Sequence, residues 1–554
     1  MKYTLLLLTF CCSLLNSQMG KAQEGNTQTV SIQVAKALQL AKVFTDNMVL
    51  QQQQVVPVWG KANTGSTVTV SFLDQTISTK ANKKGDWLVE LSPLTASYTP
   101  AKLIIETSKI STKEKTIINN VLVGEVWLSS GQSNMRFTLA KSFGGNKEVA
   151  QSKNNNIRLL DFTNKKFHPA KEAFNVTDLE QLTPDNYFQS QGWQVSNAKN
   201  SKTFSAVAYH FANKLQQTLD VPVGIINVAV GGSLMENFIS HEKLASIKSL
   251  AKLNGYWLDN IPEWCASRAK YNLSAWFEKH PDTLPNHPFK PSFLFEAGIE
   301  PLVPFAIKGA IWYQGESNAP IHHSTTQDSI ILNPDSAYRG EFLLELSKLK
   351  FKTLISDWRE QWQKSDLPFY FVQLPGLNRP WAPFRQMQFD VTNEVKNTGM
   401  AVTYDLGHPT DVHPNNKKPV GHRLARLALS HEYGKDIVAN GPMLSYAEQE
   451  TSSIKVIYRA QKHDSSSLIT LGNSTKIKGF EIAAADGVFI AAQAKIKNNH
   501  ILVSNPNISV PTMVRYGWFD DPKNKANLGN KAGLPAAPFN SQLSRLFSTK
   551  IKGH

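Results

Sequence analysis

The sequence predicts an α/β protein whose parallel, five-stranded central sheet is covered by helices on both faces. Five apolar runs lack the alternation of a sheet with one exposed face, and stretches with helical periodicity separate them. Shorter β-like runs flank this region, which indicates additional β-rich domains. The expected central strands are residues 121–128, 221–230, 305–313, 368–374 and 400–406, and the expected helices are residues 206–219, 341–362 and 418–433.

The flanking regions have the pattern of small β-domains. Short apolar runs alternate there with turn-forming sequences such as Asn63-Thr64-Gly65, which is typical of a β-sandwich. The central region is interrupted by a segment rich in Trp, Lys and Pro, which is either a helical excursion beside the site or an elaborate crossover. The expected order is a β-sandwich at residues 38–118, an α/β domain at 119–438 with an insertion at about 241–300, and a C-terminal β-rich domain at 439–545.

The composition is that of a large globular protein. Of the 554 residues, 41% are hydrophobic and 19% are charged, which excludes the disordered, collagen-like and coiled-coil classes. The formal net charge is +15, but the lysines are scattered, so no nucleic-acid partner is expected. The diffuse positive field suits an anionic substrate weakly.

The N-terminus has the features of a secretory signal peptide at residues 1–22. Lys2 precedes an apolar stretch at residues 5–15, and Gly20-Lys21-Ala22 provides a small-x-small end. The stretch is shorter than the roughly 20 apolar residues of a membrane span, although an uncleaved anchor is the alternative. We therefore expect a secreted or periplasmic protein with no membrane span.

Polar and glycine-rich segments follow four of the five expected strands. In open α/β sheets, ligands bind outside the carboxyl ends of the strands, so these segments are expected to converge on one site. The segments are Ser130-Gly131-Gln132-Ser133-Asn134-Met135, Gly231-Gly232-Ser233, Gln314-Gly315-Glu316-Ser317-Asn318 and Asp411-Val412-His413-Pro414.

These residue types are the ones that acyl transfer requires. A serine hydroxyl needs a base, histidine is the usual base, a carboxylate can orient it, and amide or backbone N–H groups can stabilise an oxyanion. Each residue also has an ordinary interpretation. Ser133 could be a helix cap, Asn318 a turn residue and His413 a loop histidine, with His408 as a competing base. The convergence of four loops favours the catalytic interpretation.

Two longer motifs connect the chain to a known family. They are Gly124-Glu125-Val126-Trp127-Leu128, which runs into residues 130–135, and Trp312-Tyr313-Gln314-Gly315-Glu316-Ser317-Asn318. Weaker matches occur at residues 204–209, 355–359 and 515–518. On these motifs the sequence resembles the sialate O-acetylesterase family of SGNH-type serine hydrolases over nearly the whole mature chain. The resemblance implies a flavodoxin-like SGNH sheet.

The resemblance also implies a role for each matched residue. Ser133 would be the nucleophile, His413 the general base and Asp411 its orienting partner. The N–H groups of Ser133 and Gly232 and the side chain of Asn318 would form the oxyanion hole. No cofactor or metal is expected, since no cluster with metal-ligand spacing occurs. Candidate substrate contacts are Gln132, Gln314, Glu316, Trp381 and Arg385.

The expected function is hydrolysis of the O-acetyl esters of a carbohydrate through a serine acyl-enzyme, with sialic acid as the first expected sugar. An acetylxylan or other polysaccharide acetylesterase is the alternative, because the loops that form the rim of the pocket are not predictable. A non-catalytic carbohydrate-binding protein on a hydrolase fold is an alternative of a different class. The presence of Ser133, Asn318 and His413 argues against that class.

Overall fold

The computed structural model describes residues 38–541, except 110–111, 165, 170–172, 321–335, 460–467 and 473. These residues belong to one compact unit that begins at Leu38. The expected signal peptide at residues 1–22 lies outside the described residues. Within the described part of the chain, no helix has both the length and the apolar character needed to cross a bilayer.

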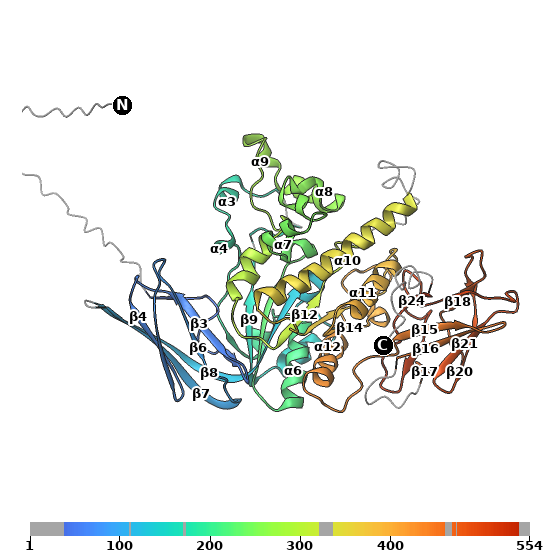
Figure 1. Ribbon diagram of the computed structural model, residues 1–554, viewed down its shortest axis with the longest axis horizontal. Coiled ribbons are helices and arrows are strands. Elements are labelled where there is room, and N and C mark those ends of the chain that lie inside the picture. The colour runs from blue at the N-terminus through green and yellow to red at the C-terminus, as the bar shows by residue number, and fades with distance from the viewer. Residues whose placement is uncertain are drawn as a thin grey trace, which may run out of the picture. The chain divides into compact units, whose positions relative to one another are not determined.

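A large mixed sheet forms the centre of the fold (Figure 1). All five expected strands are present and pair in parallel, which confirms the α/β class, but β9 adds a sixth parallel strand. An antiparallel strand, β10, pairs with β9 at one edge. The order is β10 (Gln194–Ser196), β9 (Asn154–Phe162), β11 (Val223–Ala229), β8 (Thr112–Gly131), β12 (Gly309–Tyr313), β13 (Phe369–Val372) and β14 (Thr398–Ala401).

The sequence pattern misses β9 because its composition is polar. The strand begins with asparagines and contains Arg158 and Asp161, which interrupt the apolar run. In the structure the buried Arg158 guanidinium donates hydrogen bonds to the carbonyl oxygens of Asn47 and Asn120, at 3.1 and 3.2 Å. These hydrogen bonds offset the cost of burying the charge of Arg158. Hydrophobic periodicity alone therefore does not reveal this strand.

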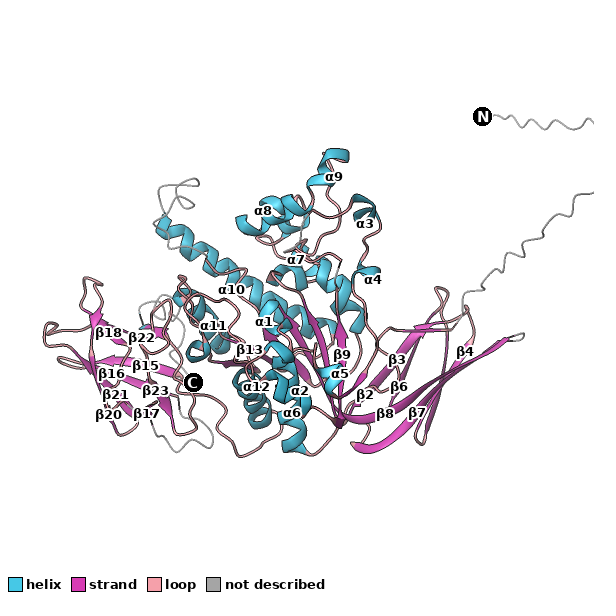
Figure 2. Cartoon of the chain, turned by 180° about the vertical axis from the view of Figure 1, so that it is seen from behind, coloured by secondary structure: helices cyan, strands magenta, loops and turns pink. Residues whose placement is uncertain are grey.

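Helices cover both faces of the sheet (Figure 2). Trp127 of β8 packs in the core that contains α6 and α12, whereas Val126 and Leu128 belong to the core that contains α10 and α11. This alternation is required of a strand buried on both faces. The covering helices are α6 (Ala206–Leu219), α10 (Ser336–Gln361), α11 (Ala382–Glu394) and α12 (Lys418–His431). The shorter helices are α1 (Ser133–Arg136), α2 (Gly145–Ala150), α3 (Val176–Glu180), α4 (Pro184–Tyr187), α5 (Ala198–Ser201), α7 (His241–Ser246), α8 (Glu263–Asn272) and α9 (Ser274–Lys279).

Strand β8 joins the N-terminal strands to the central sheet. It is 20 residues long, pairs first with β7 and then with β11 and β12, and ends at the candidate site. The expected domain boundary between residues 118 and 119 therefore falls inside a continuous strand. The N-terminal strands are β1 (Gln39–Leu40), β2 (Val49–Gln51), β3 (Val56–Lys61), β4 (Thr67–Phe72), β5 (Gln75–Lys80), β6 (Asp86–Leu91) and β7 (Ser97–Lys109).

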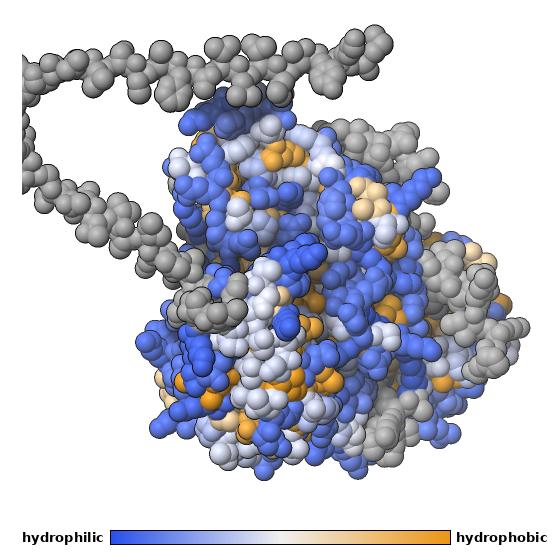
Figure 3. Space-filling view, turned by 60° about the vertical axis from the view of Figure 1, so that its left-hand side comes forward, coloured by the Kyte–Doolittle hydropathy of each residue, from blue (hydrophilic) through white to orange (hydrophobic). Residues whose placement is uncertain are grey.

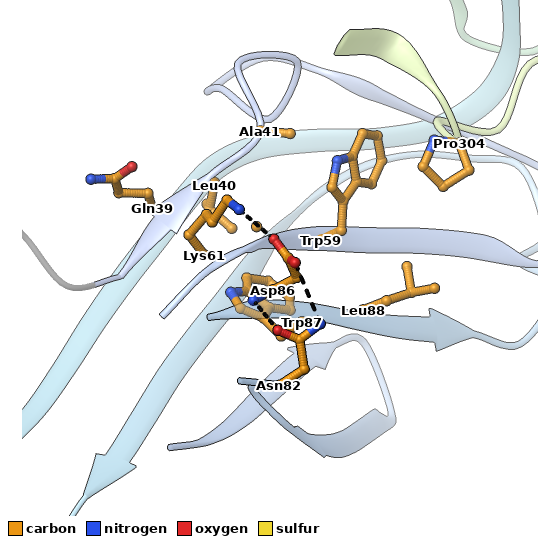
Figure 4. Close-up of a pocket in the computed structure, with 11 residues that line it drawn as sticks. Gln39, Leu40, Ala41, Trp59, Lys61, Asn82, Asp86, Trp87, Leu88 and Pro304 are labelled. Atoms are coloured by element: carbon orange, nitrogen blue, oxygen red, sulfur yellow. Dashed lines mark hydrogen bonds and ion pairs between the residues drawn. The ribbon is translucent and has the colours of Figure 1, made fainter. Parts of the chain in front are cut away.

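A cavity of about 520 Å³ lies against the sheet formed by β1, β3 and β6 (Figure 4). Trp59 and Leu88, which are opposite each other across the strands, line it together with the Lys61–Asp86 ion pair. None of the expected site residues lines this cavity. It therefore belongs to the N-terminal strands and not to the candidate site.

The C-terminal region is β-rich. Its described residues form two four-stranded sheets and one strand pair. On the face of the molecule seen in Figure 3, hydrophilic residues predominate and hydrophobic ones occur in small separate groups. The C-terminal strands are β15 (Leu444–Gln449), β16 (Ile454–Tyr458), β17 (Leu468–Thr470), β18 (Phe480–Ala483), β19 (Ile490–Ala491), β20 (Gln493–Lys497), β21 (His500–Ser504), β22 (Met513–Tyr516), β23 (Leu528–Asn530) and β24 (Phe539–Asn540).

Candidate active site

Ser133 lies directly beyond a central strand of the parallel sheet. Strand β8 ends at Gly131, where φ is +134°, and a Cβ atom there would lie 2.1 Å from the carbonyl oxygen of Tyr313. Only glycine permits this close approach of β8 and β12. Strands β9 and β11 lie on one side of β8, and β12 to β14 lie on the other. Ser133 therefore sits at a topological switch point, where ligands bind in open α/β sheets.

His413 contacts Ser133 from the loop that precedes α12. Its Nε2 atom lies 2.8 Å from Oγ of Ser133, which is a hydrogen-bond distance. Burial and the positive charge of Lys417 lower the pKa of His413, whereas the charge of Asp411 raises it. The net lowering favours the neutral imidazole, which is the form that can accept a proton from the hydroxyl.

Asp411 and His408 hold the loop that carries His413. Oδ1 of Asp411 accepts a hydrogen bond from the backbone N–H of His413 at 2.8 Å. Nδ1 of His408 accepts one from the backbone N–H of Asp411 at 3.0 Å. Of the two competing histidines, His413 is therefore the one at Ser133, and His408 supports the loop.

The glycine pair after β11 lies beside Ser133. A Cβ atom at Gly231 would lie 3.8 Å from Cβ of Ser133, and one at Gly232 would lie 3.2 Å from the Phe289 ring and 3.9 Å from the Trp264 ring. Phe289 and Trp264 both belong to the 241–300 segment, which contains helices α7, α8 and α9. Of the two interpretations of this segment, the structure therefore supports the helical excursion beside the site.

Asn318 is tied to the segment that follows the glycine pair. Its Oδ1 accepts hydrogen bonds from the backbone N–H of Met235 at 3.1 Å and from Nε2 of Gln314 at 2.7 Å. Its Nδ2 donates to a carboxylate oxygen of Glu236 at 3.0 Å. The second hydrogen of Nδ2 has no hydrogen-bond acceptor among the described residues.

Three residues that are expected to contact the substrate make hydrogen bonds that connect loops of the site. Oε1 of Gln132 accepts a hydrogen bond from the N–H of Ser317 at 3.2 Å. Nε2 of Gln314 donates to the carbonyl oxygen of Ser233 at 3.1 Å. Glu316 is buried and accepts a hydrogen bond from the Asn134 side chain at 2.5 Å. These bonds fix the relative positions of the loops after β8, β11 and β12.

Trp381 and Arg385, two further candidate substrate contacts, lie in the protein interior, where their side chains donate hydrogen bonds to backbone carbonyl oxygens. Nε1 of Trp381 donates to the carbonyl oxygen of Pro320 at 3.0 Å. The Arg385 guanidinium donates to the carbonyl oxygens of Pro375 and Asp520, both at 3.3 Å. Both side chains have 0% exposure, so they are not accessible to solvent. Arg385 joins α11 to the segment after β22.

Three residues beside the glycine pair, His168, Trp264 and Phe289, are not among those expected from the sequence. Nε2 of His168 lies 3.4 Å from the position that a Cβ atom of Gly231 would occupy. His168 follows β9, the strand that the apolar pattern does not reveal, whereas Trp264 and Phe289 come from the insertion. The position of His168 after a parallel strand is a signal in the sequence, but no sequence signal places the two aromatic rings at the glycine pair.

The chain is similar to known carbohydrate esterases over most of its length. Residues 123–252 and 295–430 match the family model described as carbohydrate esterase, sialic acid-specific acetylesterase. The sialate O-acetylesterase of Mus musculus is 26% identical over 547 residues, which cover 90% of this chain and 94% of that protein. The sialate O-acetylesterase of Homo sapiens is 26% identical over 435 residues, which cover 73% of each chain. A crystal structure of a carbohydrate acetylesterase from Xanthomonas citri matches with a TM-score of 0.70 and 29% identity, over 91% of this chain and 99% of that one.

The family match includes the loops that meet at Ser133. Ser133 and Gly232 lie in the first matched segment, and Asn318 and His413 lie in the second. The interval between the two segments falls within the helical excursion. Together with the relatives that span nearly the whole chain, this match identifies the sialate O-acetylesterases, which are carbohydrate esterases, as the family that this protein matches.

Proposed function

We propose that this protein is a serine esterase that removes O-acetyl groups from a carbohydrate, with sialic acid as the first substrate class. The observation that carries the proposal is the 2.8 Å contact between Nε2 of His413 and Oγ of Ser133. The match to the acetylesterase family model supports the acetyl ester as the bond that is cleaved. Relatives that are themselves named sialate O-acetylesterases support the choice of sugar.

In the first half-reaction, His413 accepts the hydroxyl proton of Ser133 as Oγ attacks the acetyl carbonyl carbon. The carbonyl oxygen becomes negative, and the N–H groups of Ser133 and Gly232 with the amide of Asn318 would stabilise it. The carbon–oxygen bond to the sugar then breaks. The proton on Nε2 of His413 passes to the departing sugar oxygen, which leaves an acetyl ester on Ser133.

In the second half-reaction, His413 takes a proton from water, and the hydroxide attacks the acetyl carbonyl carbon of the acyl-enzyme. The bond to Oγ of Ser133 breaks, Oγ regains its proton from His413, and acetic acid leaves and loses its proton to the solvent to give acetate. Asp411 contributes in two ways. Its carboxylate holds the backbone of His413, and its charge stabilises the imidazolium that forms in both steps.

Two further parts of the proposal concern fold type and location. The switch-point position of Ser133 and the loops from neighbouring parallel strands support a flavodoxin-like fold of the SGNH type. The sequence of residues 1–22 supports export from the cytoplasm.

The proposal is tested by measuring acetate release from acetylated sialic acids, acetylated xylan and p-nitrophenyl acetate. Purified wild-type protein and Ser133→Ala are compared, with melting temperatures as the control for folding. We expect all activity to depend on Ser133 and the sialate esters to be preferred. A preference for xylan would contradict the choice of sugar, and an active Ser133→Ala protein would contradict the mechanism.

A further inference from the structure

A cluster of three buried polar residues lies next to Ser133 and His413. Asn134, Glu316 and Lys417 have exposures of 0%, 5% and 1%. Asn134 follows Ser133 in the chain, Glu316 lies in the loop after β12, and Lys417 immediately precedes α12. None of the three takes part in the proton transfers or in the oxyanion hole of the proposed reaction.

Asn134 connects all parts of this cluster. Its Nδ2 donates hydrogen bonds to Oε1 of Glu316 at 2.5 Å and to the carbonyl oxygen of Val412 at 2.9 Å. Its Oδ1 accepts a hydrogen bond from Nζ of Lys417. Since Val412 precedes His413, the residue next to the nucleophile is bonded to the residue next to the base. A movement of Asn134 would change the distance between Ser133 and His413.

The charges of the cluster balance each other. Nζ of Lys417 lies over the rings of Phe137 and Tyr313, at 5.1 and 5.2 Å from their centroids, and Glu316 carries the opposite charge. Burial lowers the pKa of Lys417 to about 7 and raises that of Glu316, while each charge favours the ionised form of the other. Oε2 of Glu316 has no hydrogen-bond partner among the described residues.

A buried ion pair is weak evidence for stability, because an apolar pair of similar volume often serves the fold as well. The position of this cluster indicates another role. The charged groups that act on His413 are Lys417, which lowers its pKa, and Asp411, which raises it. Those that act on Lys417 are Glu316 and Asp411.

We propose that Lys417, acting through Asn134 and balanced by Glu316, is a positioning residue that holds His413 against Ser133. The inference rests on the proposed function, since it concerns the same nucleophile and base. It assigns Glu316 to the support of the catalytic pair and not to contact with the sugar.

The test compares Lys417→Met with Lys418→Met in the hydrolysis of p-nitrophenyl acetate. Lys418 is the neighbouring lysine, half exposed and paired with Glu148 on the surface. We expect Lys417→Met to lower kcat by about 10²-fold with little change in KM, because small misplacements of catalytic groups have effects of this size. The acid limb of the kcat/KM profile should move to higher pH, because the charge that lowers the pKa of His413 is absent. Lys418→Met should match the wild type in all three quantities.

A second variant guards against a folding defect. Lys417→Met leaves Glu316 without its counter-charge, so the double variant Lys417→Met/Glu316→Gln removes both charges while keeping an oxygen that can accept from Asn134. With a wild-type melting temperature, it should still show the lower kcat and the shifted acid limb. Wild-type kcat and an unmoved limb in the double variant would overturn the inference. That outcome for the double variant would leave the proposed function intact, provided that Ser133→Ala is inactive in the same assay. An active Ser133→Ala protein would overturn the proposed function itself.

Discussion

Nε2 of His413 lies 2.8 Å from Oγ of Ser133, although 280 positions separate the two residues in the chain. The contact forms because β8 ends at the same edge of the sheet as the loop before α12. Asp411 and His408 hold that loop through backbone N–H groups. Replacing each of these residues is therefore expected to have a distinct effect on turnover, on its pH dependence or on stability.

Replacing His413 with alanine should reduce turnover about as much as replacing Ser133, because nucleophile and base act as a unit. His408→Ala is the matched control. It removes a histidine from the same loop and should retain most turnover, with a small fall in melting temperature. Steady-state kinetics on p-nitrophenyl acetate measures both. An indispensable His408 together with a dispensable His413 would reverse the assignment of the base.

The pH dependence of kcat/KM should report His413. The neutral imidazole is the active form, so activity falls as pH drops through its pKa. Burial lowers that pKa below the ordinary value of about 6.5, so the acid limb should lie below about pH 6.5. A limb above that pH would mean that the environment favours the imidazolium, contrary to the observed burial and to the charge of Lys417.

Asp411→Asn should lower turnover less than His413→Ala does. An asparagine oxygen can still accept the N–H of His413, so the loop is retained, while loss of the negative charge lowers the pKa of His413 and moves the acid limb to lower pH. Kinetics across pH values measures both effects. A loss of about 10⁴-fold, typical where a carboxylate fixes the histidine tautomer, would instead assign Asp411 to the imidazole ring.

Asn318→Ala should lower kcat by about 10²–10³-fold with a smaller change in KM, because an oxyanion donor acts mainly in the transition state. The hydrogen bonds of Asn318 to Met235 and Glu236 predict a lower melting temperature as well. Turnover per folded molecule separates the two effects. Normal turnover with a lowered melting temperature would leave the oxyanion hole without its side-chain member.

His210 should make the fold sensitive to acid. It is fully buried, and burial lowers its pKa to about 4, compared with about 6.5 in an unfolded chain. Between these values the unfolded chain binds a proton that the folded protein does not, so the free energy of unfolding decreases as pH falls. His210→Phe should show a smaller fall in melting temperature between pH 7 and 5, whereas replacement of the exposed His241 should leave the fall unchanged. An equal fall in the His210 variant would refute this source of acid sensitivity.

The sequence predicts those parts of the fold that hydrophobic periodicity controls. Helix α6 begins and ends at the expected residues, and all five apolar strands form. It misses β9, because Arg158 is buried through hydrogen bonds to backbone carbonyls that only the tertiary structure supplies. The same limit applies at the site. Strand ends indicate Ser133 and His413, but sequence spacing does not distinguish a side chain that faces the substrate from one that, like Arg385, is bound to carbonyls in the interior.

The central claim is that Ser133 carries the acetyl group between the two half-reactions. Rapid acid quenching of the enzyme with p-nitrophenyl acetate, followed by mass spectrometry of its peptides, tests this claim most directly. We predict one acetyl group on the peptide that contains Ser133, formed and lost at rates consistent with turnover and absent in Ser133→Ala. Acetylation of a different residue at a competent rate, or turnover with no acetyl-enzyme when the second half-reaction is rate-limiting, would contradict the account.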